Sequence, residues 1–595
     1  MSKSEVVTSA PRVPAADAIL PKPPGGAGLE AVFRPKSIAV IGASRDRSTV
    51  GGALFHNLLK HDFQGPIYPV NPKSAVVQSV RAYPTIADVP EAVDLAVMVV
   101  PAKFVNQTLE DCGKKGVKAA VVISAGFKEV GGEGVQRERD MVQIARRYGM
   151  RVIGPNCLGV LNTEPGTSMD ATFAPPYPPA GTVAFSSQSG ALGLAILEYA
   201  TALNIGISHF VSVGNKADVS GNDLLEFWER DPNTSMVLLY LESFGNPRRF
   251  LEIARRVGRT KPIVAVKSGR TAAGMRAASS HTGSLAGTDS AVTALCHQAG
   301  VIRTDTMEEM FDVAMVLANQ PVPTGNRVGI ITNAGGPAIM ATDACESNGI
   351  EVVALTEETR KALQAFLPAE ASVRNPVDMI ASATAESFEK AVRIVANDPN
   401  VDSLIVLYVP PIVTNPLEIA QAIVRGNEEA KADRAAAGQG PKPVLSCFLG
   451  SHGVPEGLKS LQAGHIPSYT FPGSRGHRAR ARGEVRRVAE VARRQGARVH
   501  RRRSRRDAPA DRPGARARRG RGRQLVAHAG RSRVAARRVA HHDAGDRVRA
   551  FGRRSGHVGR AARVPGRGQA RERHDHAQER RRRRAARPAQ LEGRA

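Results

Sequence analysis

The chain has 595 residues, a net charge of +28 and five scattered cysteines, and its length predicts three or four domains. The excess charge lies after Pro472, where 123 residues carry 40 arginines, no lysine and 10 acidic residues, whereas the preceding residues balance at −2. This distribution argues against a generally basic nucleic-acid-binding body. The scattered cysteines argue against a disulfide framework or a metal site, and the apolar runs are too short to cross a membrane. We therefore expect a cytoplasmic protein.

The predicted elements begin after a leader, residues 1–30, which lacks a continuous apolar core and is predicted to be disordered. Short runs rich in Val and Ile then alternate with amphipathic segments of helical length. Runs such as SIAVIGAS and DLAVMVVP are typical of parallel strands covered by helices on both faces. We expect an α/β fold of three consecutive doubly wound domains, at residues 31–165, 166–324 and 325–472, followed by a disordered Arg-rich tail at residues 473–595.

The first predicted strand ends in a glycine-containing turn, IAVIGASRDRSTVGG. Gly42, Ala43 and Ser44 follow the strand, and Gly51 and Gly52 precede the next helix. Free N–H groups at such a helix start can receive a phosphate. The turn does not complete the G-x-G-x-x-G pattern of dinucleotide-binding domains.

The next strand, IYPVNPK, supplies Asn71 and Lys73 where a NAD site needs an acidic residue for the ribose hydroxyls. A lysine suits a ribose that carries a phosphate, and coenzyme A has such a 3′-phosphate. The alternative is an ordinary tight turn with a surface lysine. Further strand ends at Pro101, Ser124 and Asn156 are expected on the same edge of the sheet, where α/β sheets bind ligands.

Two later helix starts and one histidine complete the candidate residues. Ser189-Gly190 in AFSSQSGALG and Gly335-Gly336 in TNAGGPAIMATD each begin a predicted helix, whose free N–H groups attract an anion. Plain helix capping is the alternative at each. His281 lies in a polar loop, SSHTGSLAG, and loops on a rigid scaffold often carry chemistry. A purely structural histidine is the alternative.

Seven motifs and their order along the chain resemble those of acyl-CoA synthetases of the nucleoside-diphosphate-forming kind. They are GAS…GG, VNPK, GPNCLG, SSQSGALG, LYLES, SSHTGSLAG and TNAGGPAIMATD. This family is similar to succinyl-CoA ligase and includes acetate–CoA ligase (ADP-forming), which the motifs also resemble. The resemblance covers residues 30–472 and implies a Rossmann-like CoA-binding domain followed by two flavodoxin-like ligase domains. It also implies the reaction acyl-CoA + phosphate + ADP ⇌ carboxylic acid + CoA + ATP.

The resemblance also assigns roles to single residues. His281 would take phosphate from an acyl phosphate and pass it to ADP, and Glu242, in LYLES, would orient that histidine. Ser189, Gly190, Gly335 and Gly336 would stabilise the phosphoryl group. The residues implied to bind coenzyme A are Gly42, Ala43, Ser44, Gly51, Lys73, Pro101, Ser124 and Asn156. Acyl-CoA and phosphate are the implied small-molecule partners, and a homo- or hetero-oligomer is expected.

Fused members of the family continue into an ATP-grasp domain, which residues 473–595 do not resemble. With Leu525, Leu591 and Phe551 as its large apolar residues besides valine, this tail cannot bury a core. A basic arm for nucleic acid is one interpretation, but a single aromatic residue leaves little base stacking. Arg, Ala, Gly and Pro together are typical of GC-rich codons read out of frame. We therefore predict a frameshift product in place of the ATP-grasp domain.

These observations predict an acyl-CoA synthetase that cannot use nucleotide alone. ADP or ATP and Mg²⁺ are expected as cofactors only where a separate ATP-grasp subunit supplies their site. The alternative is a non-catalytic CoA-binding regulatory or scaffold protein. A NAD-dependent oxidoreductase is disfavoured by Lys73 and by the incomplete glycine pattern.

Overall fold

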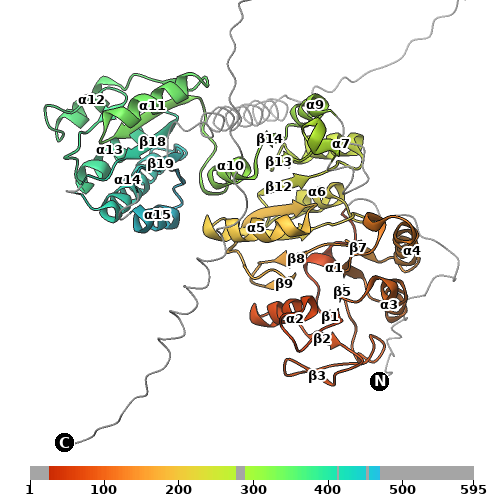
Figure 1. Ribbon diagram of the computed structural model, residues 1–595. Helices are drawn as coiled ribbons and strands as arrows, with labels where there is room; N and C mark the ends of the chain where they lie inside the picture. Colours follow the sequence, from red (N-terminus) through yellow and green to blue (C-terminus); the bar gives the residue numbers. More distant parts are fainter. Residues whose placement is uncertain (1–25, 277–287, 412–413, 451–453, 470–595) are drawn as a thin grey trace, which may run out of the picture. The chain divides into compact units, whose positions relative to one another are not determined.

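The computed structural model describes residues 26–276, 288–411, 414–450 and 454–469, which contain three successive α/β sheets (Figure 1). Most neighbouring strands in each sheet are parallel, and helices connect them. The predicted fold class is therefore confirmed for this part of the chain. Residues 1–25, the segment 277–287 that contains His281, and the tail from residue 470 lie outside the described residues.

The first sheet has the strand order β2-β1-β5-β6-β7, with all neighbours parallel. Strand β1 is apolar at every position because each face packs on a core: Ile38 and Val40 belong to one core cluster, Ala39 and Ile41 to another. The chain runs from β1 to β2 on one side and then to β5 on the other, so the sheet's switch point lies at β1. The elements are α1 (Glu30–Phe33), β1 (Ile38–Ile41), α2 (Val50–Lys60), β2 (Ile67–Val70), β3 (Val76–Val77), β4 (Val80–Arg81), β5 (Leu95–Met98), α3 (Ala102–Lys115), β6 (Ala119–Val122), η1 (Lys128–Val130), α4 (Glu133–Arg147) and β7 (Arg151–Ile153).

The second sheet has the order β14-β13-β12-β10-β11-β8-β9 and switches direction at β10. Strands β10 to β14 are parallel, whereas β8 and β9 add an antiparallel hairpin beside β11. This hairpin joins the second sheet although it begins before residue 166. The elements are β8 (Gly159–Asn162), β9 (Met169–Thr172), β10 (Ala180–Ser187), α5 (Gly190–Ala202), β11 (Ile207–Ser212), α6 (Gly221–Arg230), β12 (Met236–Leu241), α7 (Pro247–Val257), β13 (Ile263–Lys267), α9 (Asp289–Ala299), β14 (Ile302–Thr304) and α10 (Met307–Asn319).

The third sheet has the order β16-β15-β18-β19-β20, and β17 pairs with β15. It is parallel and has core clusters of its own. Its switch point lies at β15, between β16 and β18. The elements are β15 (Arg327–Thr332), α11 (Gly335–Glu346), β16 (Glu351–Val352), α12 (Glu357–Gln364), β17 (Val377–Asp378), α13 (Ala385–Asn397), β18 (Ser403–Tyr408), α14 (Pro416–Ala436), β19 (Val444–Phe448), α15 (Val454–Ala463) and β20 (Ser468–Tyr469).

The loop after β11 fastens the second sheet to the first. The N–H groups of Ala217 and Val219 donate to carbonyl oxygens at the end of β7, at 3.1 and 3.2 Å. The buried side chains of Arg151 and Asp218 form an ion pair of 2.9 Å beside them. Apolar residues of both sheets also belong to one core cluster. The carboxyl end of β7 and the loop after β11 are therefore held together.

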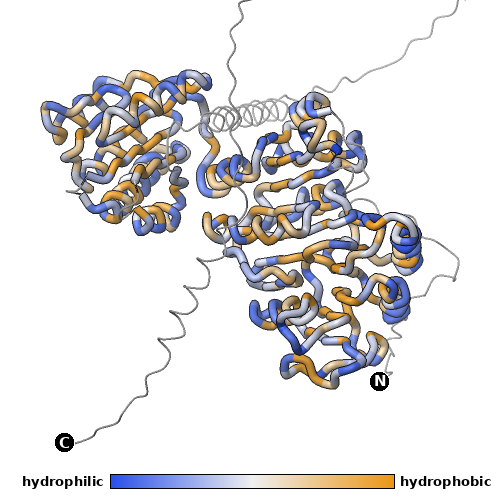
Figure 2. Tube along the Cα trace, in the orientation of Figure 1, coloured by the Kyte–Doolittle hydropathy of each residue, from blue (hydrophilic) through white to orange (hydrophobic). Residues whose placement is uncertain are grey.

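Hydrophobic and hydrophilic stretches alternate along the chain in all three regions, as expected for strands and covering helices (Figure 2). Among the described residues, no helix has both the length and the hydropathy of a membrane span.

Candidate functional site

The turn after β1 requires its glycines. Gly42 has a φ of 96°, and a Cβ there would lie 2.3 Å from the carbonyl oxygen of Val99. A Cβ on Gly51 would lie 2.1 Å from the carbonyl oxygen of Gly42. The glycines therefore let the first turn of α2 pack directly on the strand end. Because this turn follows β1, it lies at the switch point of the first sheet.

Local hydrogen bonds fix the start of α2. The hydroxyl of Thr49 caps the helix by accepting from the N–H of Gly52 at 3.1 Å. The hydroxyl of Ser44 accepts from the N–H of Asp46 at 3.1 Å. Hydrogen bonds from Ser48 lower the pKa of Asp46 and keep its carboxylate charged. The turn is thus ordered by its own side chains, and the cap leaves other first-turn N–H groups for a ligand.

Asn71 joins the ends of β1 and β2. Its amide donates to the carbonyl oxygen of Ala43 at 2.8 Å, and its side-chain oxygen accepts from the N–H of Lys73 at 2.8 Å. Lys73 therefore starts beside the turn, and its side chain is exposed. Sequence reasoning missed Gln78, in the hairpin of β3 and β4, whose amide donates to the carbonyl oxygens of Ser44 and Gly52. Strands of two residues leave no periodic signal.

The other predicted strand ends lie on the same edge of the first sheet. Pro101 is the residue before α3, and the hydroxyl of Ser124 donates to the carbonyl oxygen of Val100. The N–H of Asn156 donates to the carbonyl oxygen of Ser124 at 2.9 Å, and Asn156 has a φ of 58°. These bonds link the carboxyl ends of β5, β6 and β7. The structure thus brings the predicted residues of this edge together.

A second candidate ligand-binding edge lies at the carboxyl end of β10, the switch point of the second sheet. Ser189 caps α5, since its hydroxyl accepts from the N–H of Leu192 at 3.2 Å. A Cβ on Gly190 would lie 3.7 Å from the hydroxyl oxygen of Ser212. Ser212 is fully buried, and its hydroxyl has no hydrogen-bond partner in the part of the chain that the structure describes. An unpaired buried hydroxyl next to a helix start is a favourable place for an anion.

Glu242 follows β12, which pairs with β10 across this switch point. The N–H of Glu242 donates to the side-chain oxygen of Gln188 at 2.9 Å, which ties the end of β12 to the start of α5. Lys216 also donates to Gln188, at 3.1 Å. Sequence reasoning missed Gln188, Lys216 and Ser212, because their roles depend on contacts between distant segments.

The remaining predicted residues fall in two places. His281 lies outside the described residues, so the structure says nothing of its position. Gly335 and Gly336 begin α11 after β15, at the switch point of the third sheet, with Ala334 as the residue before the helix. Asn333 and Val409 exchange side-chain and backbone hydrogen bonds of 2.8 and 2.9 Å, which fix this turn on β18. Each of the three predicted anion-binding turns therefore follows the strand at which its sheet switches direction.

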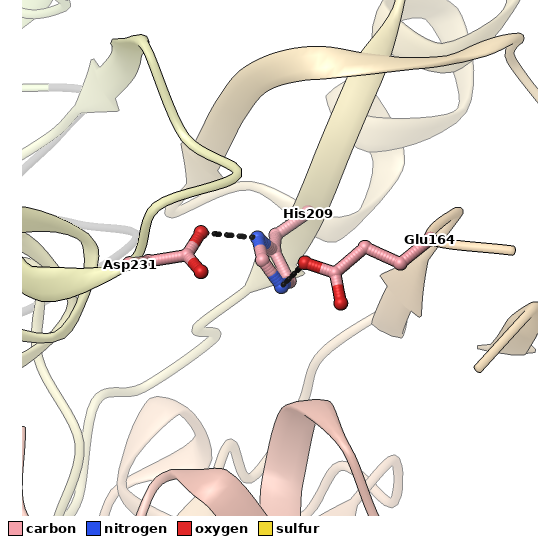
Figure 3. Close-up of side chains that lie close together, drawn as sticks. All are labelled: Glu164, His209 and Asp231. Atoms are coloured by element: carbon pink, nitrogen blue, oxygen red, sulfur yellow. Dashed lines mark ion pairs between the residues drawn. The ribbon is translucent and has the colours of Figure 1, made fainter. Parts of the chain in front are cut away.

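One acidic cluster could be mistaken for a metal site. Glu164 and Asp231 flank the buried ring of His209, at 3.6 Å from Nε2 and 3.7 Å from Nδ1 (Figure 3). Both carboxylates already bond Arg34, at 2.6 Å each. The guanidinium of Arg34 thus already supplies a positive charge to both carboxylates. The cluster is better explained as a buried ion-pair network.

The charges of this cluster follow from burial and pairing. Burial lowers the pKa of His209 to about 4, so the ring is neutral at pH 7. Burial opposes ionisation of Glu164, but hydrogen bonds from Arg34 hold its pKa at about 2. None of the five cysteines forms a disulfide, all five are buried, and burial raises the pKa of Cys157 to about 12. This thiol is therefore poorly suited to nucleophilic chemistry.

Three family models match successive parts of the chain. They describe a CoA binding domain at residues 36–163, a succinyl-CoA ligase like flavodoxin domain at residues 180–317, and a ligase-CoA domain at residues 328–485. The first two include the edges built from β1 and β10, and the third includes the turn after β15.

Two similar proteins are ADP-forming CoA ligases. The chain is 43% identical over 446 residues to acetate–CoA ligase [ADP-forming] II subunit alpha of Pyrococcus furiosus, covering 75% of this chain and 95% of that subunit. It is 39% identical to 4-hydroxybutyrate–CoA ligase [ADP-forming] of Nitrosopumilus maritimus, covering 74% of this chain and 62% of that protein.

A solved structure has a similar fold. It is the dinucleotide-forming acetyl-coenzyme A synthetase 1 of Ca. Korarchaeum cryptofilum in complex with phosphate and ADP. The match has a TM-score of 0.73 and 39% sequence identity, and it covers 79% of this chain and 99% of that chain.

Proposed function

This chain belongs to the family of ADP-forming acetate- and acyl-CoA ligases, and we propose that it carries out the CoA-dependent half of their reaction. In that half, acyl-CoA and phosphate give an acyl phosphate and free CoA, and the phosphoryl group then moves to a histidine. The observation that carries the proposal is the pair of ligand edges at the switch points β1 and β10, in segments that match a CoA-binding and a succinyl-CoA ligase like model.

The first edge is proposed to bind coenzyme A. The N–H groups at the start of α2 would hold a phosphate, since the glycines at 42 and 51 let backbone approach backbone there. Lys73 would pair with the 3′-phosphate of the ribose. Pro101, Ser124 and Asn156 would line the path from this nucleotide end toward the second edge, with Ala43 and Ser44 in the turn itself. These assignments, and the domain limits 31–165, 166–324 and 325–472, are proposals.

The second edge is proposed to carry the phosphoryl chemistry. A phosphate oxygen attacks the thioester carbonyl, a C–O bond forms, and the C–S bond breaks with CoA leaving as thiolate. A ring nitrogen of His281 then attacks phosphorus, and the carboxylate leaves. Glu242 would accept a hydrogen bond from the other ring nitrogen and so fix the tautomer that attacks. The starts of α5 and α11, at Ser189, Gly190, Gly335 and Gly336, would stabilise the charge of the phosphoryl group.

The nucleotide half is proposed to need a second protein. One relative of which this chain covers 95% is an alpha subunit, whereas the chain covers 62% of the 4-hydroxybutyrate–CoA ligase. We therefore expect ADP and Mg²⁺ to be bound by a separate ATP-grasp subunit, and no residue of the described part is assigned to them. The frameshift origin of residues 473–595 stays a prediction.

The proposal is tested by release of CoA thiol. Mixing the full chain with acetyl-CoA and phosphate, without nucleotide, should release free CoA and bind phosphate to protein in equal amounts, close to one per active chain. Omitting phosphate should abolish both signals. A non-catalytic CoA-binding protein would bind CoA but release no thiol, and that result would refute the proposal.

A further inference from the structure

A hydrogen-bonded cluster at the start of α5, called the hub below, consists of Gln188, Lys216, Glu242 and Ser243. The side-chain oxygen of Gln188 accepts hydrogen bonds from the N–H groups of Glu242 and Ser243, at 2.9 Å each, and from Lys216 Nζ at 3.1 Å. Its amide nitrogen donates to the carbonyl oxygen of Ser243 at 2.8 Å. Three donors on one side and an acceptor on the other fix the orientation of this amide. The position of Glu242 therefore depends on Gln188.

Lys216 completes this hub. Besides Gln188, its ammonium donates to the hydroxyl and the carbonyl oxygen of Ser243, at 2.6 and 3.2 Å. These three bonds use all three donors of an ammonium group. All three acceptors are uncharged, so none of them neutralises the positive charge of Lys216, which therefore acts on charged groups farther away.

The loop that carries Lys216 is anchored on the CoA-binding side. The N–H of Asn215 donates to the carbonyl oxygen of Pro155 at 2.9 Å, and its amide donates to Glu129 and Glu138 at 2.6 and 2.8 Å. Lys216 itself has a φ of 58°, a strained conformation for a residue with a side chain. A strained lysine held at the junction of two ligand edges suggests a functional constraint.

Charged groups surround Lys216 from three directions. Lys128, in η1, donates to the carbonyl oxygen of Asn215 at 3.0 Å and pairs with Glu138 at 3.6 Å. Glu242 follows β12, and Lys267 ends β13. Burial and the charge of Lys128 lower the pKa of Lys216 to about 8, while Glu242 acts in the opposite direction and Lys267 adds to the lowering. Lys216 therefore titrates just above neutral pH.

We propose that Lys216 is a positioning residue for Glu242: with Gln188, its ammonium fixes the turn at residues 242–243 and so holds Glu242 in place for the phosphoryl-accepting histidine. This inference rests on the proposed function. When Lys216 loses its proton, one bond of the hub is lost and one of the positive charges near the Glu242 carboxylate disappears. Histidine phosphorylation then slows as the pH rises through the pKa of Lys216.

The experiment measures the single-turnover rate of protein phosphorylation from acetyl-CoA and radioactive phosphate between pH 6 and 9.5. The full chain should show a rate that falls above about pH 8. Lys216→Met should lower the rate at pH 7 by about 10- to 100-fold, as expected for loss of an orienting contact, and should lose the alkaline fall. Lys216→Arg should keep most of the rate and also lose the fall, because a guanidinium stays charged in this range.

Lys442→Met is the matched control. Burial also lowers the pKa of Lys442 to about 8, and its ammonium bonds the carbonyl oxygen of Asp398 at 2.6 Å before β19 in the third sheet. This control should keep both the rate and the alkaline fall. A Lys216→Met protein with the unchanged rate and pH profile would overturn the inference alone. Absence of phosphorylation in the full chain would overturn the proposed function and this inference with it.

Discussion

The side-chain oxygen of Gln188 accepts a hydrogen bond from the N–H of Glu242 at 2.9 Å, across the pair of strands β10 and β12. One bond thus joins the helix start proposed to hold the phosphoryl group to the backbone of Glu242, whose carboxylate is proposed to orient the histidine. The two parts cannot shift independently. This relationship makes the charge of Glu242 testable apart from its position.

Glu242→Gln keeps the size of the side chain and the backbone bond to Gln188 but removes the charge. We expect histidine phosphorylation to slow by about 10- to 100-fold, because the amide is a weaker acceptor for the imidazole. Single-turnover labelling measures the effect. Glu252→Gln, an exposed glutamate of α7, serves as the control and should leave the rate unchanged. Equal rates for both variants would remove Glu242 from the mechanism.

Lys73→Met tests the proposed contact with the 3′-phosphate. Calorimetry should show CoA binding weakened by about 1 kcal/mol, or roughly fivefold, since the pair is exposed. Binding of 3′-dephospho-CoA should not change. Lys118→Met is the control, because Lys118 pairs with Asp94 at 2.8 Å before β6, on the opposite edge of the sheet. An equal loss for both ligands would show that Lys73 does not read this phosphate.

Gly51→Ala tests the close approach at the start of α2. A methyl group 2.1 Å from a backbone oxygen forces the helix away from β1, and overpacking of this kind costs about 1–3 kcal/mol or more. We expect a lower free energy of unfolding in denaturant and weaker CoA binding. Gly166→Ala introduces the same methyl group with nothing within 4 Å, so both quantities should stay at the native values. A fully stable Gly51→Ala protein would contradict the packing at this turn.

His209→Phe tests the buried ion-pair network. His209 has a pKa of about 4 in the fold and about 6.5 in the unfolded chain, so the fold favours the neutral ring. The resulting stability is fully present above pH 6.5 and is lost as the pH falls toward 4, by up to about 3 kcal/mol. The variant should lose less stability between pH 7 and pH 5, as measured by denaturant unfolding. The exposed His297→Gln should keep the native dependence, and an unchanged slope in His209→Phe would contradict the assignment.

Much of the fold follows from local sequence. Continuous apolar runs predicted the parallel strands, because both faces of each sheet are covered, as the alternating cores of β1 show. The turns after β1, β10 and β15 were predicted from Gly42, Ser189 and Gly335. Each lies at a switch point, which the order of elements along the chain cannot reveal because it depends on where later strands pair.

The contacts that complete the candidate site were not predictable from local patterns. Along the chain, Lys216 lies 27 residues and Gln188 55 residues before Ser243. Their bonds to Ser243 arise only when β10, β11 and β12 align. The hairpin of β8 and β9 was divided by the expected boundary at residue 165, since its pairing with β11 is a tertiary contact. Likewise, His209 reads as one more residue of an apolar strand until Glu164 and Asp231 are seen beside it.

The central claim is that an acyl-CoA phosphorylates this chain on His281. The direct measurement is mass spectrometry of the chain after incubation with acetyl-CoA and phosphate, under conditions that preserve phosphohistidine. We expect acid-labile phosphate on His281, none in His281→Ala, and nearly equal CoA affinity of the two proteins by calorimetry, because the CoA edge belongs to the first sheet. Phosphate on another residue, or equal labelling of His281→Ala, would contradict the claim.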